Sequence, residues 1–460
     1  MFLDVVILAA GKGTRMRSAR AKVLHTIGGK PMLQHVLDTA RQLAPRQICP
    51  VIGHQGDEVR DAIDDSTLTW VEQAQQLGTG HAVREAMAHV ADDGVVLVLY
   101  GDVPLIGQST LKTAVSAATS GDVGLVTAVF ADPAELGRIV RNARGDVTRI
   151  VEFKDADEST RQINEINSGI VAVPAADLNR WLNQLDTDNA QGELYLTDII
   201  EMAENDGKKV TSIAAQPHEV IGVNDRVQLA EVERLYQAQQ TETLMRAGTT
   251  MQDPSRVDIR GEITVGEDCL FDVNVVLEGK VVLGDRVQLG PGVVIKDSVI
   301  GDGTVVHAYT TIDGATVAAE CSLGPFARIR PLTVLDEGVR IGNFVETKKS
   351  HLGAGSKANH LAYLGDATLG RDCNVGAGAI TANYDGVNKY ETHAGDNVFV
   401  GTNVTMVAPL NLQDWAFLAA GSTVTNDVGE NDLAVARGKQ RVIRKWTRPD
   451  QAAAKKKASD

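Results

Sequence analysis

The sequence predicts two folds in series, an α/β domain followed by a parallel β-helix. In the first half, continuous apolar runs alternate with segments of helical periodicity, the pattern of a sheet covered by helices on both faces. From residue 263 to 346, an aliphatic or small residue recurs at nearly every sixth place, with Gly, Asp and Asn between. Neither an α-helix nor a flat strand has a period of six. The chain must therefore turn a corner every few residues.

Each six-residue unit is expected to be a short strand plus a turn, with one aliphatic side chain pointing inward. A single unit cannot bury that side chain, so only a stack of many units is stable. The positions in this series are Ile263, Cys269, Val275, Val281, Val287, Val293, Val299, Val305, Thr311, Val317, Leu323, Ile329, Leu335 and Ile341. The period resumes at Leu369 and continues to Val424. Two segments do not fit, 347–366 and 382–397, and we expect them to be loops that project from one face and carry binding sites.

The first half reads as strands that alternate with helices. Residues 4–9 form a continuous apolar run, which is typical of a strand buried on both faces. A helix is expected to begin at Pro31, a residue that suits a first turn. Further strands are expected at 48–52, 68–71 and 95–100, and a further helix from Thr79. The alternation predicts a parallel sheet, and ligands of such sheets bind at the carboxyl ends of the strands.

Three clusters follow these strands. The first is residues 8–16 (LAAGKGTRM) with Lys22 shortly after, where glycines allow close approach to a phosphate and cations add positive charge. Its spacing is neither a Walker loop nor GxGxxG, and a purely structural turn is an equal alternative. The second combines Gln73 with a glycine turn at 78–82. The third is residues 100–102, where Asp102 could hold a divalent metal beside phosphates or simply form a turn.

Other polar residues end apolar segments later in this half. Residue chemistry alone ranks Gly137, Glu152, Asn167 and Asn224 as turn formers. From Asp225, a good N-cap, a mostly polar helix is expected to run to about residue 247 and to end at a glycine. Such a helix fits a connection between two domains.

Composition narrows the class of protein. A chain of 460 residues has room for roughly three domain-sized units. Its net charge of −15 argues against nucleic-acid binding, which needs clustered Lys and Arg. The only basic run, 455–457, lies in an Ala- and Lys-rich tail that is expected to be disordered. Four cysteines without metal-ligand spacing, no apolar run of membrane-spanning length and no signal-peptide pattern predict a soluble, cytoplasmic protein.

Two sets of motifs carry a resemblance to a known family. LAAGKGTRM, KVLH, QLGTGHA, YGDVPL, VEFKDA, INSGI and GVNDR resemble the first half of the bifunctional N-acetylglucosamine-1-phosphate uridyltransferase / glucosamine-1-phosphate acetyltransferase family. GPFARIRP, GNFVETKKS, NHLAYLGDA, NVGAGAITANYDG and ARGKQ resemble its second half. Both sets occur in the right order on one chain. Other sugar nucleotidyltransferases share the first set but lack the region around His360.

The resemblance implies a domain plan and an activity. It implies a Rossmann-like uridyltransferase domain at 1–226, a linker helix at 227–248, and a left-handed β-helix acetyltransferase domain at 249–460 that ends in a flexible tail and forms a homotrimer. The implied enzyme acetylates glucosamine 1-phosphate with acetyl-CoA. It then transfers UMP from UTP to N-acetylglucosamine 1-phosphate and releases pyrophosphate, with Mg²⁺ as cofactor. UDP-N-acetylglucosamine is a precursor for peptidoglycan and lipopolysaccharide, which links the family to cell-wall biogenesis and cell shape.

The resemblance also assigns residues in the first half. Arg15 and Lys22 are implied as the catalytic cations that face the triphosphate, and Asp102 and Asn224 as the magnesium ligands. The residues implied to bind UTP and the sugar nucleotide are Leu8, Ala9, Ala10, Gly11, Lys22, Gln73, Gly78, Thr79, Tyr100, Gly101, Asp102, Gly137, Glu152, Asn167 and Asn224.

In the second half, His360 is implied as the catalytic base. The residues implied to bind the amino-sugar phosphate are Arg330, Lys348, Tyr363 and Asn374. Those implied to bind acetyl-CoA are Ala377, Asn383, Tyr384, Thr402, Ala420 and Arg437. The sequence departs from the family at Ala21 (often Pro), Thr402 (commonly Ser, with the hydroxyl kept) and Ala382 (frequently Cys).

The chemistry is compatible with these roles, and alternatives stay open. A neutral histidine suits the removal of a proton from the amine of glucosamine 1-phosphate, although a lone histidine is more often structural. Arg330 and Lys348 on neighbouring rungs favour the catalytic interpretation of His360. One alternative is a single-function sugar nucleotidyltransferase whose β-helix only assembles oligomers. The other is a non-catalytic sensor of sugar nucleotides.

Overall fold

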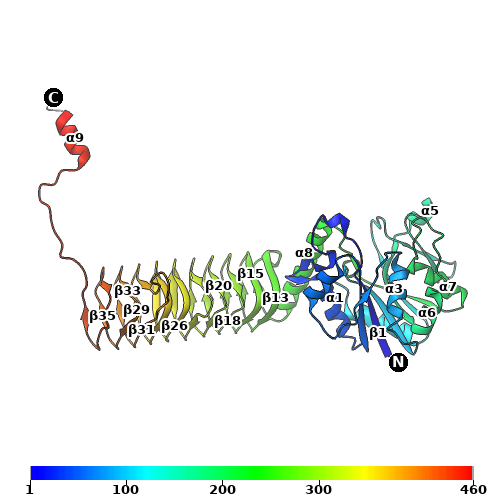
Figure 1. Cartoon of the computed structure of the whole chain (residues 1–460), viewed down its shortest axis with the longest axis horizontal. Coiled ribbons are helices and arrows are strands. Elements are labelled where there is room, and N and C mark those ends of the chain that lie inside the picture. Colours follow the sequence, from blue (N-terminus) through cyan, green and yellow to red (C-terminus); the bar gives the residue numbers. More distant parts are fainter. Residues whose placement is uncertain (1, 458–460) are drawn as a thin grey trace. The chain divides into compact units, whose positions relative to one another are not determined.

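The computed structural model describes residues 2–457 and separates into two compact units. The first unit comprises Met1–Arg246 with Pro254–Glu262, and the second comprises Ala247–Asp253 with Ile263–Asp460. Figure 1 shows helices around a sheet in the first unit and stacked short strands in the second. Among the described residues, no helix is both long and apolar enough to cross a membrane.

The first unit is built on a twisted sheet with strand order β11-β7-β10-β6-β1-β4-β5. Strand β1 pairs in parallel with β4 and β6, and β11 pairs in parallel with β7, but β10 runs antiparallel to both β6 and β7. The parallel arrangement predicted for β1, β4, β5 and β6 is therefore confirmed. Strand β10, for which no prediction was made, is antiparallel, because the hairpin β8–β9, with no long crossover helix, leads from β7 into β10.

The strands of this unit are β1 (Phe2–Leu8), β2 (Thr26–Ile27), β3 (Lys30–Pro31), β4 (Gln47–Ile52), β5 (Val71–Glu72), β6 (Gly94–Tyr100), β7 (Val123–Val129), β8 (Arg138–Arg141), β9 (Val147–Val151), β10 (Glu165–Pro174) and β11 (Val210–Ala214). Its α-helices are α1 (Met32–Arg41), α2 (Gly56–Ile63), α3 (Thr79–Met87), α4 (Gln108–Thr119), α5 (Glu158–Arg161), α6 (Ala175–Leu182), α7 (Ile199–Asn205) and α8 (Arg226–Arg246). Its 3₁₀ turns are η1 (Thr14–Met16), η2 (Lys22–Leu24), η3 (Leu196–Asp198), η4 (Pro217–Val220) and η5 (Pro254–Arg256).

Both faces of the sheet are buried, as the continuous apolar strands predicted. Along β1, Val5 and Ile7 pack into one apolar cluster while Val6 packs into another. Successive side chains of a strand point to opposite faces, so each cluster lies on one side of the sheet. The helix predicted from Pro31 is confirmed as α1, which begins at the next residue.

Helix α8 packs closely on the first unit. Val232 is fully buried with Met16, Ile27 and Met32. The Gln237 side chain accepts a hydrogen bond from the Ile259 N–H (2.7 Å) and donates one to the Ile259 carbonyl (2.8 Å). A mostly polar helix thus makes a defined contact through a few residues. Independent activity of the two halves stays a prediction.

The second unit is a three-sided coil of parallel strands, so the predicted fold class is confirmed. One side is the ladder β12 (Thr250–Met251), β14 (Leu270–Phe271), β16 (Gln288–Leu289), β19 (Val305–Val306), β22 (Ser322–Leu323), β25 (Arg340–Asn343), β27 (Lys357–His360), β29 (Asn374–Val375), β32 (Phe399–Val400), β35 (Phe417–Leu418) and β37 (Leu433–Ala434).

The other two sides are joined by long strands that turn a corner. Their strands are β13 (Val257–Val265), β15 (Val275–Leu283), β17 (Val294–Lys296), β18 (Val299–Ile300), β20 (Thr311–Asp313), β21 (Thr316–Val317), β23 (Arg328–Ile329), β24 (Val334–Leu335), β26 (Glu346–Leu352), β28 (Tyr363–Leu369), β30 (Ile380–Ala382), β31 (Thr392–Ala394), β33 (Thr405–Val407), β34 (Leu410–Leu412) and β36 (Thr423–Val424). Helix α9 (Pro449–Lys457) follows the coil, and residues 458–460 of the predicted tail lie outside the described residues.

The six-residue period is confirmed, but the prediction that every sixth residue from 263 to 341 points inward is wrong. Val299 is 45% exposed, Thr311 is exposed, and Val305 is only partly buried. The inward series instead contains the buried residues Ile295, Ile300, Val306 and Ile312. The phase changes because the steps from 295 to 300 and from 312 to 317 are five residues long. Both short steps cross the same corner, so stacking is preserved.

The same corner explains the two segments that did not fit. Residues 347–366 are not a projecting loop: β26 and β28 pair in register along most of their length, from Glu346 opposite Tyr363 to Leu352 opposite Leu369. Five-residue steps at this corner had moved the period out of phase. Residues 383–391, in contrast, leave the stack between β30 and β31 and are mostly exposed. The loop predicted at 382–397 is thus confirmed for 383–391 and wrong for β31, which pairs with β28 and β34 in the stack.

Candidate functional site

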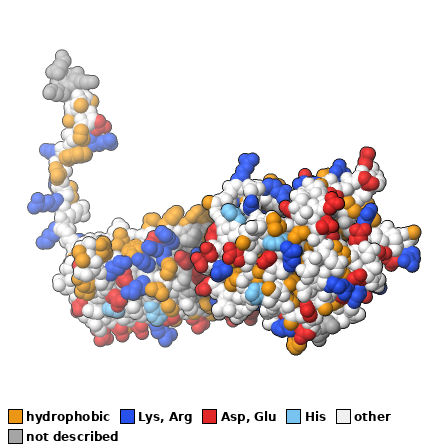
Figure 2. All heavy atoms as spheres, turned by 45° about the vertical axis from the view of Figure 1, so that its right-hand side comes forward, with side chains coloured by type: hydrophobic (Ala, Val, Ile, Leu, Met, Phe, Trp, Pro, Cys, Tyr) orange, Lys and Arg blue, Asp and Glu red, His pale blue; other side chains and the backbone are white. Residues whose placement is uncertain are grey.

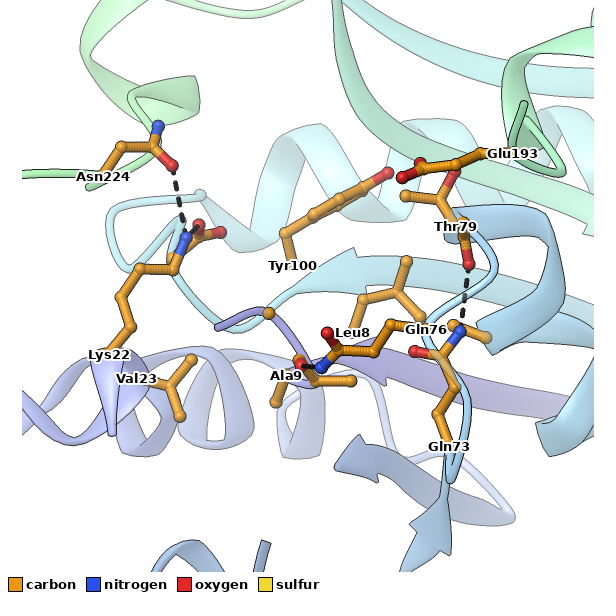
Figure 3. A pocket seen from close by; sticks show the side chains of 15 residues that line it. Leu8, Ala9, Lys22, Val23, Gln73, Gln76, Thr79, Tyr100, Glu193 and Asn224 are labelled. Carbon is orange, nitrogen blue, oxygen red and sulfur yellow. Dashed lines mark hydrogen bonds and ion pairs between the residues drawn. The ribbon is translucent and has the colours of Figure 1, made fainter. Parts of the chain in front are cut away.

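A cavity of about 350 Å³ opens at the carboxyl ends of the first unit's strands (Figure 3). Gly11 lies beyond β1, Gln73 beyond β5 and Asp102 beyond β6, where ligands of such sheets bind. The residues that line it are Leu8, Ala9, Ala10, Gly11, Lys22, Val23, Gln73, Gln76, Gly78, Thr79, Ala82, Tyr100, Asp102, Glu193 and Asn224. The structure thus brings together residues from both ends of a chain segment of more than 200 residues.

At one end of the cavity, the Lys22 ammonium lies between the side-chain oxygens of Asp102 and Asn224. The Lys22 ammonium forms an ion pair with Asp102 and donates a hydrogen bond to Oδ1 of Asn224 at 3.2 Å. Carboxylate and amide oxygens are ligands that hard divalent cations prefer. Within residues 2–457 no group of three or more His, Cys, Asp or Glu is placed to hold a metal. Asp102 and Asn224 therefore fit a divalent cation, which would take its remaining ligands from substrate and water.

The glycine-rich turn lies beside this cation site. Gly13 adopts a left-handed backbone with φ of 56°, and a Cβ built there would lie 2.7 Å from Cβ of Lys22. Glycine thus lets the turn approach Lys22. Arg15 lies on η1 and is exposed, and it is not among the residues that line the cavity.

The opposite wall is set by the turn before α3. Gln73 Nε2 donates a hydrogen bond to the Gly78 carbonyl at 3.1 Å, and the Leu196 N–H donates one to Oγ1 of Thr79 at 3.1 Å. Gly78 has φ of 111°, and a Cβ built there would lie 2.5 Å from the Leu194 carbonyl oxygen. Only glycine fits this close approach. Gly101 lies under the cavity, where its N–H donates to the Leu8 carbonyl at 2.9 Å.

The remaining residues predicted to bind the sugar nucleotide lie near Tyr100. Asn167 and Tyr100 line a second, smaller pocket with Thr197. The Asn167 N–H donates to the Gly137 carbonyl at 2.9 Å, and Glu152 accepts a hydrogen bond from Thr197 at 3.2 Å. Burial raises the pKa of Glu152; the hydrogen bond from Thr197 opposes this, and Asp155 adds to it. Burial, with Glu152 and Asp102, likewise raises the pKa of the Tyr100 phenol, so it stays a neutral donor.

In the second unit, four predicted residues form one column on a corner of the coil. His360 pairs in register with Asn343 on the preceding coil. Hydrogen bonds then run from the Gly378 N–H to the His360 carbonyl (3.3 Å), from Asn403 to Ala377 (2.7 Å) and from Gly421 to Thr402 (2.8 Å). These bonds stack the corner residues His360, Ala377, Thr402 and Ala420. Arg437 donates a hydrogen bond to the Ala420 carbonyl at 2.7 Å and extends the column.

His360 lies at the end of strand β27 and is exposed, so the expectation that it belongs to an inserted loop is wrong. Its ring Nδ1 lies 3.1 Å from Oδ1 of Asn343. An amide oxygen only accepts, so Nδ1 carries the hydrogen and Nε2 keeps a lone pair that can accept a proton. Asn343 was missed by sequence reasoning; its signal is the one-coil spacing of 17 residues before His360.

The phosphate-binding candidates lie on the side that follows this corner. Tyr363 begins β28, and Arg330 and Lys348 lie on successive coils at the far end of the same side. Arg330 forms an ion pair with Glu346 at 2.6 Å. The neighbouring Lys389 ammonium, and then Arg330, lower the pKa of Lys348, and the Asp366 carboxylate opposes this. Asn374 lies one coil above Lys357 on the adjacent side.

The structure does not bring Asn383 and Tyr384 to the His360 column of the same chain. Asn383 donates a hydrogen bond to buried Asp366, which also forms an ion pair with Lys349 at 3.2 Å. Lys349 and Asp366 have positive φ at the next corner of the coil. Tyr384 is exposed in the projecting loop. Four residues that line the cavity were not among those assigned to UTP and sugar-nucleotide binding: Val23, Gln76, Ala82 and Glu193. Val23 lies in the motif KVLH, and Gln76 and Ala82 lie in QLGTGHA, whereas Glu193 has no motif signal.

Together, fold and cavity define the class: a nucleotidyltransferase domain joined to a hexapeptide-repeat β-helix. Residues 5–248 match the model of the MobA-like NTP transferase domain, and residues 259–346 match that of the GMPPB C-terminal domain. A curated relative from Marinobacter nauticus, the bifunctional protein GlmU, is 54% identical over 451 residues, which cover 98% of this chain and 99% of the relative. This chain belongs to the bifunctional GlmU family. It is therefore an enzyme with two transferase activities, and its family implies a divalent metal.

Proposed function

We propose that this enzyme makes UDP-N-acetylglucosamine by two successive transfers. The second unit acetylates glucosamine 1-phosphate with acetyl-CoA, and the first transfers UMP from UTP to N-acetylglucosamine 1-phosphate. The observation that carries the proposal is the convergence of Lys22, Asp102 and Asn224 in the strand-end cavity, on a chain that also carries the His360 column.

In the first unit, the nucleophile is a phosphate oxygen of N-acetylglucosamine 1-phosphate, which attacks the α-phosphorus of UTP in line. It is already an anion, so it requires no general base. The difficulty is to bring two anions together, and Lys22, with Arg15 once the turn closes on phosphate, lowers that repulsion. We propose Mg²⁺ as the cation on Asp102 and Asn224, where it would neutralise phosphate charge.

In the second unit, the amine of glucosamine 1-phosphate must lose a proton before it attacks the thioester carbonyl. Nε2 of His360 accepts that proton, because Asn343 holds the hydrogen on Nδ1. Arg330 and Lys348 bind the sugar phosphate and so hold the amine near the base. The backbone N–H groups near Ala377 are candidates to stabilise the oxyanion. The thiolate of coenzyme A leaves.

We further propose that the working form is a homotrimer assembled through the β-helix. Two features support it. Asn383 and Tyr384 lie at a different corner from His360, so a neighbouring copy would supply them. Tyr309, Phe326 and Phe344 stack at 5.2 and 5.6 Å as exposed side chains on the corner that bears His360. Figure 2 shows hydrophobic side chains along one edge of the coil. Sedimentation equilibrium would give three times the chain mass if this is correct.

We propose a cytoplasmic location, which the four buried, unpaired cysteines support, because oxidising compartments favour disulfides.

One assay tests the two activities. The full chain is given glucosamine 1-phosphate, acetyl-CoA, UTP and magnesium, and free thiol and pyrophosphate are followed together. Release of both supports the proposal. Pyrophosphate formed only from added N-acetylglucosamine 1-phosphate, without thiol, would indicate a single-function nucleotidyltransferase, and release of neither would indicate a sensor.

A further inference from the structure

The nucleotide cavity contains a carboxylate that no proposed step uses. Glu193 lines the cavity with Gly78, Thr79 and Tyr100. Figure 3 draws Lys22 and Asn224 at one end of the cavity and Glu193 with Thr79 at the other. Of the nearby carboxylates, Asp102 pairs with Lys22 and Glu152 accepts from Thr197. Within residues 2–457, the Glu193 carboxylate has no hydrogen-bond or ion-pair partner.

The position of Glu193 is fixed by its backbone. The Asn189 side chain accepts from the Glu193 N–H at 3.2 Å and donates to its carbonyl at 2.6 Å. The next residue is bonded to the turn before α3, with Leu194 N–H to Leu77 carbonyl at 2.8 Å and Gly80 N–H to Leu194 carbonyl at 2.9 Å. A Cβ on Gly78 would lie 3.0 Å from Cβ of Glu193. Such anchoring keeps the side chain on the cavity wall.

Partly buried carboxylates without partners cost free energy, and a ligand that supplies a donor recovers it. A carboxylate accepts hydrogen bonds and repels phosphate. The cation that lines this cavity, Lys22, lies at its other end (Figure 3). The charges therefore favour phosphates near Lys22 and a neutral donor near Glu193.

We propose that Glu193 is a specificity-determining residue that accepts a hydrogen bond from a sugar hydroxyl of the bound substrates. The inference rests on the proposed uridylyl transfer. Two sugars bring such hydroxyls to the cavity, the ribose of UTP and the ring of N-acetylglucosamine 1-phosphate. A carboxylate that orients a sugar in this way acts through binding, so its loss raises a KM more than it lowers kcat.

The test uses the full chain with Glu193→Ala and the isosteric Glu193→Gln. Asp188→Ala and Asp188→Asn are matched controls, because Asp188 is exposed, lies in the same segment and does not line the cavity. KM is measured for each substrate with the other saturating. We expect Glu193→Ala to raise one of the two KM values at least ~10-fold, the scale of a lost hydrogen bond to a charged group. The substrate whose KM rises identifies the sugar.

Each outcome decides the matter. Both KM values within about twofold of wild type, or an equal rise in the Asp188 variants, would overturn the inference while leaving uridylyl transfer intact. A fall in kcat alone would also overturn it. A wild-type urea midpoint for the first unit confirms that it is folded; if Glu193→Ala does not fold, the KM values of Glu193→Gln decide. A wild-type enzyme that releases no pyrophosphate would instead refute the proposed function itself.

Discussion

The two units present their candidate residues in opposite ways. In the first, residues as far apart as Leu8 and Asn224 converge on a cavity, and their side chains are partly or fully buried. In the second, His360, Thr402 and Ala420 are exposed along a corner and are separated by whole coils. In the sheet, the site lies where the ends of several strands meet. In the coil, the candidate residues lie at equivalent positions of successive coils. One chain thus encloses its candidate nucleotide site but leaves its candidate acetyl-transfer residues exposed.

Replacing His360 should impair acetyl transfer alone. We expect His360→Ala to lower acetyl transfer by ~10²–10⁴-fold, the usual worth of a positioned base. Uridylyl transfer and sedimentation should not change, because the side chain points away from the coil interior. Near-normal acetyl transfer would rule out the base role.

Removing the negative charge of Asp102 should impair uridylyl transfer alone. Asp102→Asn keeps the shape of the side chain, and we expect it to lower uridylyl transfer at least ~100-fold, the scale of losing one electrostatic stabiliser. Acetyl transfer, measured by thiol release, should be unaffected. A parallel fall in both activities would mean that Asp102 is structural.

A pair of fragments tests how self-contained the first unit is. Residues 1–226 lack α8 and expose the cluster that Val232 covers, whereas residues 1–262 retain the helix and the Ile259 contact of Gln237. Both should transfer uridylyl groups, but the shorter should be less stable by at least about 2 kcal/mol, from the burial of one large side chain. Urea unfolding monitored by tryptophan fluorescence measures the difference. Equal midpoints would show that α8 adds nothing to this unit.

The smallest expected effect is a pH dependence confined to the first unit. Burial, then Asp186 and Glu152, raises the pKa of Asp198 from 3.8 to about 6. The folded state therefore holds this proton more tightly, and the stability it contributes below about pH 4 is lost as pH rises through 6. Two pKa units correspond to about 3 kcal/mol, which solvent screening reduces to roughly 1 kcal/mol at this partly exposed group.

The variant Asp198→Asn cannot ionise, so it does not lose this stability as the pH rises. In the fragment 1–262, the variant should be more stable than wild type by roughly 1 kcal/mol at about pH 7.5 and equal to it at about pH 4. Urea midpoints at the two pH values measure this. A variant that is less stable at the higher pH would show that the carboxylate is needed where it stands.

Sequence reasoning located the strand ends well because buried strands leave continuous apolar runs. It could not place β10, since periodicity is the same in either direction, or Glu193, whose role arises from a contact with a turn more than 100 residues earlier. In the coil, counting by six identified the fold but lost phase at the corner where sides of five residues occur. His360 was recognised from its motif, while its place on a regular strand came from pairing with Asn343.

The column of corner residues that begins at His360 also has a fixed spacing. Successive coils of parallel strands are spaced by about 4.8 Å, so the three steps from His360 to Ala420 span about 14 Å. This spacing depends on the number of coils and not on the number of residues, which is 17, 25 and 18 for the three steps. If the acetyl-CoA of the proposed reaction binds along this column, the number of coils sets the distance that it must span. Inserting or deleting one whole coil would change the length of the column by about 4.8 Å while leaving each corner intact.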